Sequence, residues 1–309
     1  QKLVFEKCSS QYEKEEIKKN LAKKPKKTQV LLMFWKYFFL LRDFRRVFWY
    51  TLFRSFFLRN IMKLLTKRIG ILGHGVEGKS LAHFFQDRRI RDLKIYDEKQ
   101  GEFPNFDEIS DRDVLFRSPG VSPRHPKLQS FSGKIMGSLD LFLQLCPTKK
   151  VIGITGTKGK GTVSTLIARM FEEANDTVFL AGNIGTPFFD ALPNIRTRDV
   201  TILELSSFQL WDAQQSPNIA VLLGISEDHL EVHDDFEDYI DAKKNIYLHQ
   251  KSGGKVIFDA DCPLVSKLMD EQNEGRGVPV SLEKEYNYGA FLRGENLIWK
   301  DEEENEDII

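Results

Sequence analysis

Cysteine is scarce in this sequence. The 309 residues include three cysteines, Cys8, Cys146 and Cys262, which lie far apart and form no Cys-x-x-Cys pair. An odd and scattered set of thiols supports neither a disulfide framework nor a zinc site. The sequence therefore favours a protein of the reducing cytoplasm.

A long apolar run is also missing from the most hydrophobic stretch, residues 30–61. A membrane-spanning helix needs about 20 apolar residues, and Lys36 interrupts this stretch early. No small-residue cleavage site follows it, so a secretory signal is not indicated. Two interpretations of residues 1–61 stay open. Residues 30–61 could form a basic aromatic helix on a membrane surface, or the whole segment could be an extension without a defined fold, which we prefer.

The sequence has no net charge, because 45 Lys and Arg balance 45 Asp and Glu. The balance hides an asymmetry: residues 1–68 hold 18 basic and 5 acidic residues, whereas residues 69–309 hold 27 and 40. The larger part of the chain is thus acidic. We expect no nucleic acid partner.

Strand and helix patterns alternate from Ile69 onward. The first candidates are three buried strands and one helix, at residues 68–73, 92–97, 113–121 and 79–89. This alternation predicts an α/β fold with a doubly wound parallel sheet. We expect one domain over residues 62–148 and a second over residues 149–309, with the segment "CPTKK" between them.

Three glycines, Gly73, Gly75 and Gly78, separate the first strand from the first helix, and Asp97 follows Gly78 by nineteen residues. This pattern is typical of a loop that holds a nucleotide diphosphate at a helix N-terminus, with the carboxylate on a sugar or base hydroxyl. A tight turn without a ligand and a nicotinamide dehydrogenase are the alternatives.

A second glycine loop opens the second domain in "VIGITGTKGKGTVSTL", residues 151–166. Its glycines would let successive backbone N–H groups surround phosphate oxygens, while Lys160 adds charge. The spacing is G-x-x-G-K, shorter than in general P-loop proteins. The predicted nucleotide-binding residues are Gly156, Thr157, Lys158, Gly159, Lys160, Gly161 and Thr162. A helix should follow, because apolar residues recur there at helical spacing: Val163, Leu166, Ile167, Met170 and Phe171.

Metal ligands are expected at the same sheet edge. Glu204 ends the apolar strand pattern "VTILE", and the next such pattern leads into Asp228, His229 and His233. Parallel strands present their ligands at their carboxyl ends, and phosphoryl transfer uses hard oxygen ligands around magnesium. Glu204 and His229 therefore predict a metal site beside the phosphate loop.

Five segments in this order resemble the central domain of the Mur ligases, specifically the MurD type: "ITGTKGKGT", "AGNIGTP", "LELSSFQL", "SEDHLEVH" and "YIDAKKNIY". The first domain agrees, because "IGILGHGVEGKS", "KIYD", "SPGVSPRHPKL" and "IMGSLDLF" are similar to the uridine diphosphate-binding domain of that family. The match covers about residues 64–300. It implies a Rossmann-like substrate domain followed by a P-loop α/β ATPase domain.

The resemblance implies a cytoplasmic ligase of peptidoglycan precursor synthesis. Such an enzyme uses ATP and Mg²⁺ to add D-glutamate to UDP-N-acetylmuramoyl-L-alanine through an acyl phosphate, and we expect a monomer. The alternative is another Mur-type or P-loop ATPase that binds a UDP-linked ligand without this ligation. The family's third domain, which brings the amino acid, is expected beyond Ile309, so we interpret the chain as a fragment.

The catalytic and metal-binding roles follow from the resemblance where the letters match. Lys160 would contact the ATP phosphates, Glu204 one magnesium ion and His229 a second. Lys243 matches the lysine of the family's Y-x-x-A-K pattern and would be carbamylated, acting as a carboxylate towards that second metal. Its neighbour Lys244 has an equal chemical claim, and the helix register decides between them. The spacing places Lys243 on one helix face with Tyr239, Ile246 and Tyr247, and it predicts that Lys244 points elsewhere.

The resemblance also implies which residues contact the substrate, and this chain departs from the family's sequence at one position in the phosphate loop. The residues expected along the muramoyl-alanine path are Asn183, Ser206 and Gln209, and those at the uridine diphosphate are Val76, Glu77 and Asp97. The family usually has Ser or Thr directly after the loop lysine, where this chain has Gly161. Thr162 is therefore the hydroxyl expected on the first magnesium.

Overall fold

The computed structural model describes residues 63–272, 277–301, 303 and 305–308. The predictions for residues 1–61 lie outside these ranges. The described residues all belong to one compact unit. Within the described ranges, every helix is too short or too polar to cross a bilayer.

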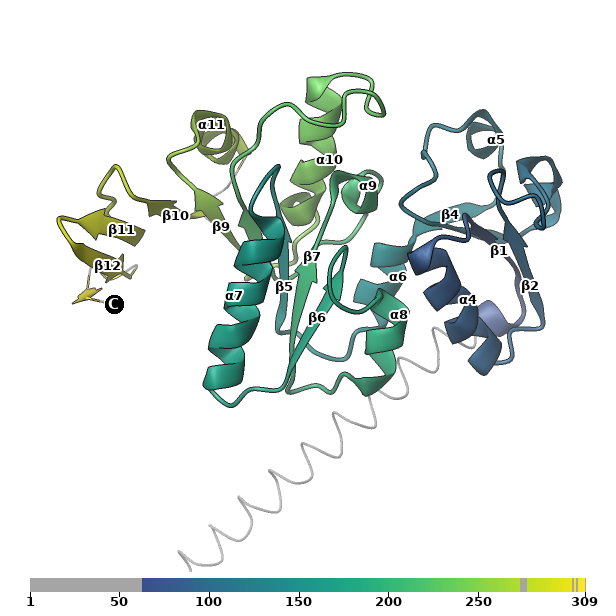
Figure 1. The fold of residues 1–309 in the computed structure, drawn as a ribbon, viewed down its shortest axis with the longest axis horizontal. Helices are drawn as coiled ribbons and strands as arrows, with labels where there is room; N and C mark the ends of the chain where they lie inside the picture. The colour runs from purple at the N-terminus through teal and green to yellow at the C-terminus, as the bar shows by residue number, and fades with distance from the viewer. Residues whose placement is uncertain (1–62, 273–276, 302, 304, 309) are drawn as a thin grey trace, which may run out of the picture. The chain divides into compact units, whose positions relative to one another are not determined.

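The first sheet has four parallel strands in the order β2-β1-β3-β4 (Figure 1). These are β1 (Arg68–Leu72), β2 (Asp92–Tyr96), β3 (Val114–Arg117) and β4 (Lys134–Gly137). The helical elements are α4 (Val76–Asp87), the 3₁₀ helix η1 (Phe106–Asp111), α5 (Pro126–Gln129) and α6 (Ser138–Leu145). Because β1 has β2 on one side and β3 on the other, the predicted doubly wound arrangement is confirmed.

Apolar side chains of alternating strand positions cover this sheet. One cluster joins Leu72, Tyr96 and Leu115 to Phe106 and Ile109 of η1. Gly78 allows α4 to approach the sheet closely, since a Cβ atom there would lie 2.0 Å from the carbonyl oxygen of Gly73. No side chain fits at that distance, so this glycine fixes how the loop and the helix meet.

The second sheet has nine strands in the order β13-β12-β11-β10-β9-β8-β5-β7-β6. Its strands are β5 (Val151–Thr155), β6 (Val178–Gly182), β7 (Val200–Glu204), β8 (Ile219–Leu222), β9 (Lys255–Asp259), β10 (Gly277–Ser281), β11 (Gly289–Arg293), β12 (Asn296–Lys300) and β13 (Glu306–Ile308). The strands from β6 to β11 are parallel to their neighbours, and β12 and β13 extend the sheet in antiparallel fashion. The sequence patterns did not predict β6 or β9 to β13.

Helices and turns of the second sheet are α7 (Lys160–Glu173), α8 (Phe188–Ala191), the 3₁₀ helix η2 (Leu192–Asn194), α9 (Ser207–Leu210), α10 (Phe236–Leu248) and α11 (Pro263–Gln272). The expected helix after the phosphate loop is confirmed as α7. Val163, Ile167 and Phe171 pack on the sheet, but Leu166 is 53% and Met170 is 69% exposed. The small side chains of Ser164 and Ala168 complete the buried face instead.

The two sheets meet through buried contacts. Helix α4 packs on α8, where the rings of Phe84 and Phe189 lie 5.0 Å apart. Arg117 at the end of β3 is buried and donates to both carboxylate oxygens of Asp212, at 2.9 and 2.5 Å. The predicted boundary near residue 148 separates the sheets in sequence, yet these contacts join them into one compact unit.

Candidate active site

The phosphate loop lies at the carboxyl end of β5, between β7 and β8, where the winding of the sheet reverses. Helix α7 begins at Lys160, and its N-cap residue, Gly159, has a φ of 81°. Glycine adopts this left-handed conformation without steric cost. No side chain caps the helix, so its first N–H groups and the positive end of its dipole are available to an anion.

Thr157 holds the loop in place. Its backbone N–H donates to the carbonyl of Gly224 at 2.9 Å, and its hydroxyl lies 3.0 Å from the carbonyl of Ser226. The same hydroxyl is 3.1 Å from that of Tyr239 on α10. Thr157 thus shapes the loop with a side chain that is already bonded, whereas Lys158 is exposed.

Lys160 folds back over its own loop. The Nζ atom donates to the carbonyl oxygens of Gly156 and Thr157, at 3.1 and 3.0 Å. In the described part of the chain, no carboxylate lies within 4.0 Å of this ammonium group. A phosphate group would offer it charged oxygens in place of neutral carbonyls, which is the stronger hydrogen bond.

Lys243 is 1% exposed and reaches the same loop from α10. Its Nζ atom donates to the carbonyl of Gly156 at 2.8 Å and lies 4.5 Å from the centre of the Tyr239 ring. Burial lowers the pKa of Lys243 to about 7, and the nearby positive charge of Lys160 lowers it too. The helix register is as predicted, since Lys244 lies elsewhere and pairs with Asp241 at 2.6 Å.

Glu204 supplies a buried carboxylate at the end of β7. It is 2% exposed, and its Oε1 atom accepts a hydrogen bond from the Asn183 side chain at 3.2 Å. No lysine, arginine or histidine of the described ranges pairs with it within 4.0 Å. A buried carboxylate without a cationic partner is costly, so this environment suits a metal ion. A Cβ atom on Gly161 would lie 3.9 Å from Oε2, so the carboxylate faces the first turn of α7.

His229 lies on the loop after β8 in a left-handed conformation, with a φ of 55°. Such a backbone is strained for a residue other than glycine, and strain of this kind concentrates at functional sites. The ring lies 5.0 Å from that of Phe208, and Nδ1 is 3.4 Å from a carboxylate oxygen of Glu231. The imidazole is partly exposed and could reach a ligand.

The donors at this edge suit magnesium by their chemistry. The described residues contain no group of three or more His, Cys, Asp or Glu placed to hold a metal ion. Additional oxygens would have to come from the hydroxyl of Thr162, from a carbamate on Lys243 or from phosphate. Together with Glu204, these are the hard oxygen ligands that magnesium prefers.

Ser206 and Gln209 form a capping box at the start of α9. The Ser206 hydroxyl accepts from the backbone N–H of Gln209 at 3.3 Å, and the Gln209 side chain accepts from the backbone N–H of Ser206 at 3.0 Å. Both residues are predicted to lie along the muramoyl-alanine path, and the S-x-x-Q spacing of a capping box is a signal that the prediction did not use. Their placement on one short turn beside Glu204 remains compatible with that prediction.

The residues predicted for uridine diphosphate differ in their surroundings. Val76 is exposed at the start of α4, whereas Glu77 and Asp97 are buried. Burial would raise the pKa of Asp97, but backbone N–H donors, including those of His74 and Lys99, outweigh it and lower this pKa. Both oxygens of Asp97 thus already accept hydrogen bonds, and the residue shapes the loop that follows β2.

Glu77 is turned towards α8. Neither of its carboxylate oxygens forms a hydrogen bond of good geometry. Burial raises its pKa to about 7, the backbone N–H of Phe188 opposes this effect, and the charge of Asp190 adds to it. Glu77 is therefore placed where the two sheets meet rather than in an open pocket.

Comparison with known proteins agrees with these motifs. Residues 154–305 match the family described as the Mur ligase middle domain. The UDP-N-acetylmuramoylalanine–D-glutamate ligase of Clostridium tetani is 31% identical over 255 residues, covering 76% of this chain and 55% of that protein. The chain belongs to the Mur ligase family. The predicted resemblance, including its MurD type, is confirmed by relatives of this kind.

A second relative of the Mur ligase chain, the UDP-N-acetylmuramoylalanine–D-glutamate ligase of Clostridium botulinum, is 36% identical over 262 residues, or 77% of this chain and 56% of that protein. The chain spans about half the length of the curated relatives it matches. Among solved structures, UDP-N-acetylmuramate:L-alanyl-gamma-D-glutamyl-meso-diaminopimelate ligase from Neisseria meningitides is 15% identical, with a TM-score of 0.49 and coverage of 79% of this chain and 84% of that one.

Proposed function

We propose that this Mur ligase chain carries the UDP-substrate-binding and ATP-binding parts of an enzyme that joins D-glutamate to UDP-N-acetylmuramoyl-L-alanine. The observation that carries the proposal is the position of Lys243, which is buried against the carbonyl of Gly156 in the phosphate loop. A structural lysine has little reason to lie there, next to the charge of Lys160. The identity of the substrates rests on the names of the relatives.

The side chains around the loop have distinct roles in this proposal. The N–H groups at the start of α7 and the ammonium group of Lys160 bind the phosphates of ATP. Glu204, Thr162, His229 and the modified Lys243 hold magnesium, which would spread the negative charge of the phosphates. The first sheet binds the uridine diphosphate part of the substrate near Val76.

Lys243 becomes a metal ligand by a simple addition. Its neutral amine attacks the carbon of carbon dioxide, a nitrogen–carbon bond forms and the amine gives up a proton to solvent. The product is a carbamate anion, whose oxygens replace a cation that would repel magnesium. The lowered pKa supports this step, because only the unprotonated amine has a free electron pair.

The reaction then proceeds in two transfers. The alanine carboxylate of the substrate attacks the γ-phosphorus of ATP, the bond between this phosphorus and the bridging oxygen breaks, and ADP departs. The product is an acyl phosphate. The amine of glutamate attacks the acyl carbon, phosphate departs and an amide forms. Positioning and charge stabilisation account for catalysis of such a phosphoryl transfer. Among the described side chains, none is placed as a clear base for the amine proton.

Calorimetry on this chain tests the proposal. We expect saturable binding of UDP-N-acetylmuramoyl-L-alanine, weaker binding of UDP alone, and magnesium-dependent binding of a non-hydrolysable ATP analogue. UDP should bind because it occupies the first sheet without the acyl end. Binding of the ATP analogue without any binding of UDP or the UDP-linked substrate would favour a P-loop ATPase of another kind.

A further inference from the structure

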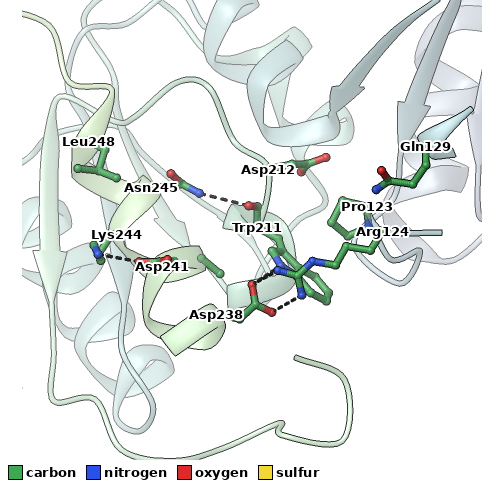
Figure 2. A pocket seen from close by; sticks show the side chains of 11 residues that line it. Pro123, Arg124, Gln129, Trp211, Asp212, Asp238, Asp241, Lys244, Asn245 and Leu248 are labelled. Carbon is green, nitrogen blue, oxygen red and sulfur yellow. Dashed lines mark hydrogen bonds and ion pairs between the residues drawn. The ribbon is translucent and has the colours of Figure 1, made fainter. Parts of the chain in front are cut away.

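A line of polar contacts begins at Arg124, in the loop between β3 and α5. Its guanidinium group donates two hydrogen bonds to Asp238 on α10, at 2.9 and 2.6 Å. It also pairs with Asp234 at 2.6 Å and lies 5.5 Å from the centre of the Trp211 ring. Figure 2 shows the side chain of Arg124 directed at the carboxylate of Asp238, with Trp211 beside both. One arginine of the first sheet's loops thus engages the start of α10.

Asp238 extends this line of contacts from Arg124 toward the protein interior. Its carboxylate is mostly buried, and it accepts from the indole N–H of Trp211 at 3.1 Å and lies 3.0 Å from Nδ1 of His233. Burial would raise the pKa of Asp238, but the hydrogen bonds from Arg124, His233 and Trp211 outweigh it and lower this pKa. A charged carboxylate only accepts, so Nδ1 of His233 carries the proton in this pair.

His233 connects Asp238 to the turn of α9. Its Nε2 atom lies 3.0 Å from the hydroxyl of Ser207. With Nδ1 protonated in a neutral ring, Nε2 accepts the hydrogen bond from Ser207. The ring is held by aromatic neighbours, at 5.6 Å from Phe208 with near-parallel planes and at 4.2 Å from Trp211. Few orientations of the imidazole are compatible with these contacts.

The Asp238–His233–Ser207 geometry is that of a hydrolase triad, but its surroundings exclude that role. Both Ser207 and His233 are buried, so no acyl group could reach the hydroxyl. A triad needs an open site next to its nucleophile. Asp238 and His233 therefore have a structural effect, which is to fix the position of Ser207.

Ser207 belongs to the turn that carries Ser206 and Gln209, the residues proposed for the acyl end of the substrate. It stands between Ser206, a member of the capping box, and Phe208, whose ring lies 5.0 Å from that of His229. Fixing the position of Ser207 therefore also fixes the turn assigned to muramoyl-alanine and the Phe208 ring, which supports His229. The outer end of the line is the ion pair of Arg124, which belongs to the domain assigned to uridine diphosphate.

We propose that Arg124, Asp238 and His233 form a positioning relay, which sets the 206–209 turn for the acyl end of the UDP-linked substrate. Through the relay, the loop after β3 determines how well that end is held once uridine diphosphate is bound. The inference rests on the proposed function, because it takes the 206–209 turn as the acyl site. The relay residues themselves need not contact the substrate.

The cavity in Figure 2 makes Arg124 suitable for testing. The space of about 730 Å³ is lined by Arg124, Trp211, Asp238, Asp241 and Lys244, among others. Its charged groups are already paired, Arg124 with Asp238, Lys244 with Asp241 and Asp212 with Arg117 outside the lining, so we assign it no ligand. Because it leaves the Arg124 side chain 43% exposed, replacing this residue removes the ion pair without opening a packed core.

The test compares two ligands on three variants of the whole chain. Arg124→Ala should bind UDP within about twofold of the wild type but bind UDP-N-acetylmuramoyl-L-alanine about tenfold more weakly, as expected for a lost charge-assisted contact. The affinity of Arg124→Lys for UDP-N-acetylmuramoyl-L-alanine should lie between those of the wild type and Arg124→Ala, because lysine can pair with a carboxylate but cannot form the bidentate contact. Arg293→Ala is the matched control, since Arg293 is 44% exposed and also pairs with two carboxylates, those of Glu285 and Glu306.

The outcomes separate this inference from the proposed function. The relay is supported if Arg124→Ala loses affinity for the full substrate but not for UDP, if Arg124→Lys recovers part of that affinity, and if Arg293→Ala loses none. Equal affinities of wild type and Arg124→Ala for both ligands, or equal losses for UDP and for the full substrate, would overturn the relay alone. If the wild-type chain binds neither ligand, the proposed function fails and the relay fails with it.

Discussion

The Nζ atom of Lys243 lies 2.8 Å from the carbonyl oxygen of Gly156. This contact joins a buried lysine of α10 to the first residue of the phosphate loop, and it is made by the residue with the lowered pKa. Lys244, one position further along, turns to Asp241 instead. The chemistry of these two adjacent lysines should therefore differ sharply.

The first prediction is that Lys243 alone forms a carbamate. In buffer with ¹³C-labelled bicarbonate at about pH 8, the wild type and Lys244→Ala should show a carbamate carbon by NMR, and Lys243→Ala should not. The signal should weaken as the pH falls through about 7, because the protonated amine that predominates below this pKa cannot attack carbon dioxide. A carbamate that persists in Lys243→Ala would remove this residue from the site.

The second prediction concerns Lys160, whose ammonium group contacts only loop carbonyls in the described structure. Lys160→Ala should weaken binding of a magnesium–ATP analogue about tenfold or more, since a charge-assisted contact contributes roughly 1.5–3 kcal/mol. The melting temperature should change little because the side chain is not part of a core. Lys251→Ala, which replaces an exposed lysine between α10 and β9, is the control and should bind normally. Unchanged affinity in Lys160→Ala would mean that the loop is only a turn.

Periodicity in the sequence was enough to predict the buried face of α10. Tyr239, Lys243, Ile246 and Tyr247 were expected on one face from their spacing, and all four are buried. The same reasoning gave only part of the α7 face, where Leu166 and Met170 are exposed. Spacing places side chains around a helix, but it does not tell how wide a stripe the sheet covers.

Contacts between distant segments were beyond sequence reasoning. Arg124 and Asp238 are 114 positions apart and Arg117 and Asp212 are 95 apart, so no local pattern links them. Their pairing depends on how the two sheets meet. The buried position of Glu77 has the same origin, because only the packing of α4 on α8 removes its carboxylate from water.

The third prediction is a pH-dependent gain in stability for Glu77→Gln. In the folded chain the pKa of Glu77 is raised from 4.5 to about 7. Between these values the folded state keeps a proton that the unfolded state loses, so this residue lowers the unfolding free energy as the pH rises. The penalty is complete above about pH 7 and absent well below 4.5.

Urea denaturation at several pH values measures this effect. Glu77→Gln should raise the unfolding free energy at about pH 8 by roughly 1–3 kcal/mol, and the gain should shrink as the pH approaches 5. Glu295→Gln, an exposed residue between β11 and β12, should change stability little at any pH. A gain that is independent of pH would show that the carboxylate is not buried in its charged form.

The last prediction concerns Gly161, which stands where the family usually has a hydroxyl. A Cβ atom at this position would lie 3.7 Å from Ile184 and 3.9 Å from the Glu204 carboxylate, both ordinary contact distances. A serine therefore fits, and its hydroxyl would lie near the carboxylate proposed to hold magnesium.

We expect Gly161→Ser to bind magnesium–ATP more tightly than the wild type, by about three- to tenfold for one added oxygen ligand or hydrogen bond. Gly161→Ala is the matched variant, because it adds the same Cβ atom without the hydroxyl, and its helix propensity gain of roughly 1 kcal/mol is at least as large as that of serine. If serine and alanine raise the affinity equally, the gain comes from a more rigid first turn of α7 and not from a ligand to the metal. If serine lowers the affinity while alanine does not, the hydroxyl competes for Glu204, and the first magnesium of this chain would be held without a side-chain hydroxyl at position 161.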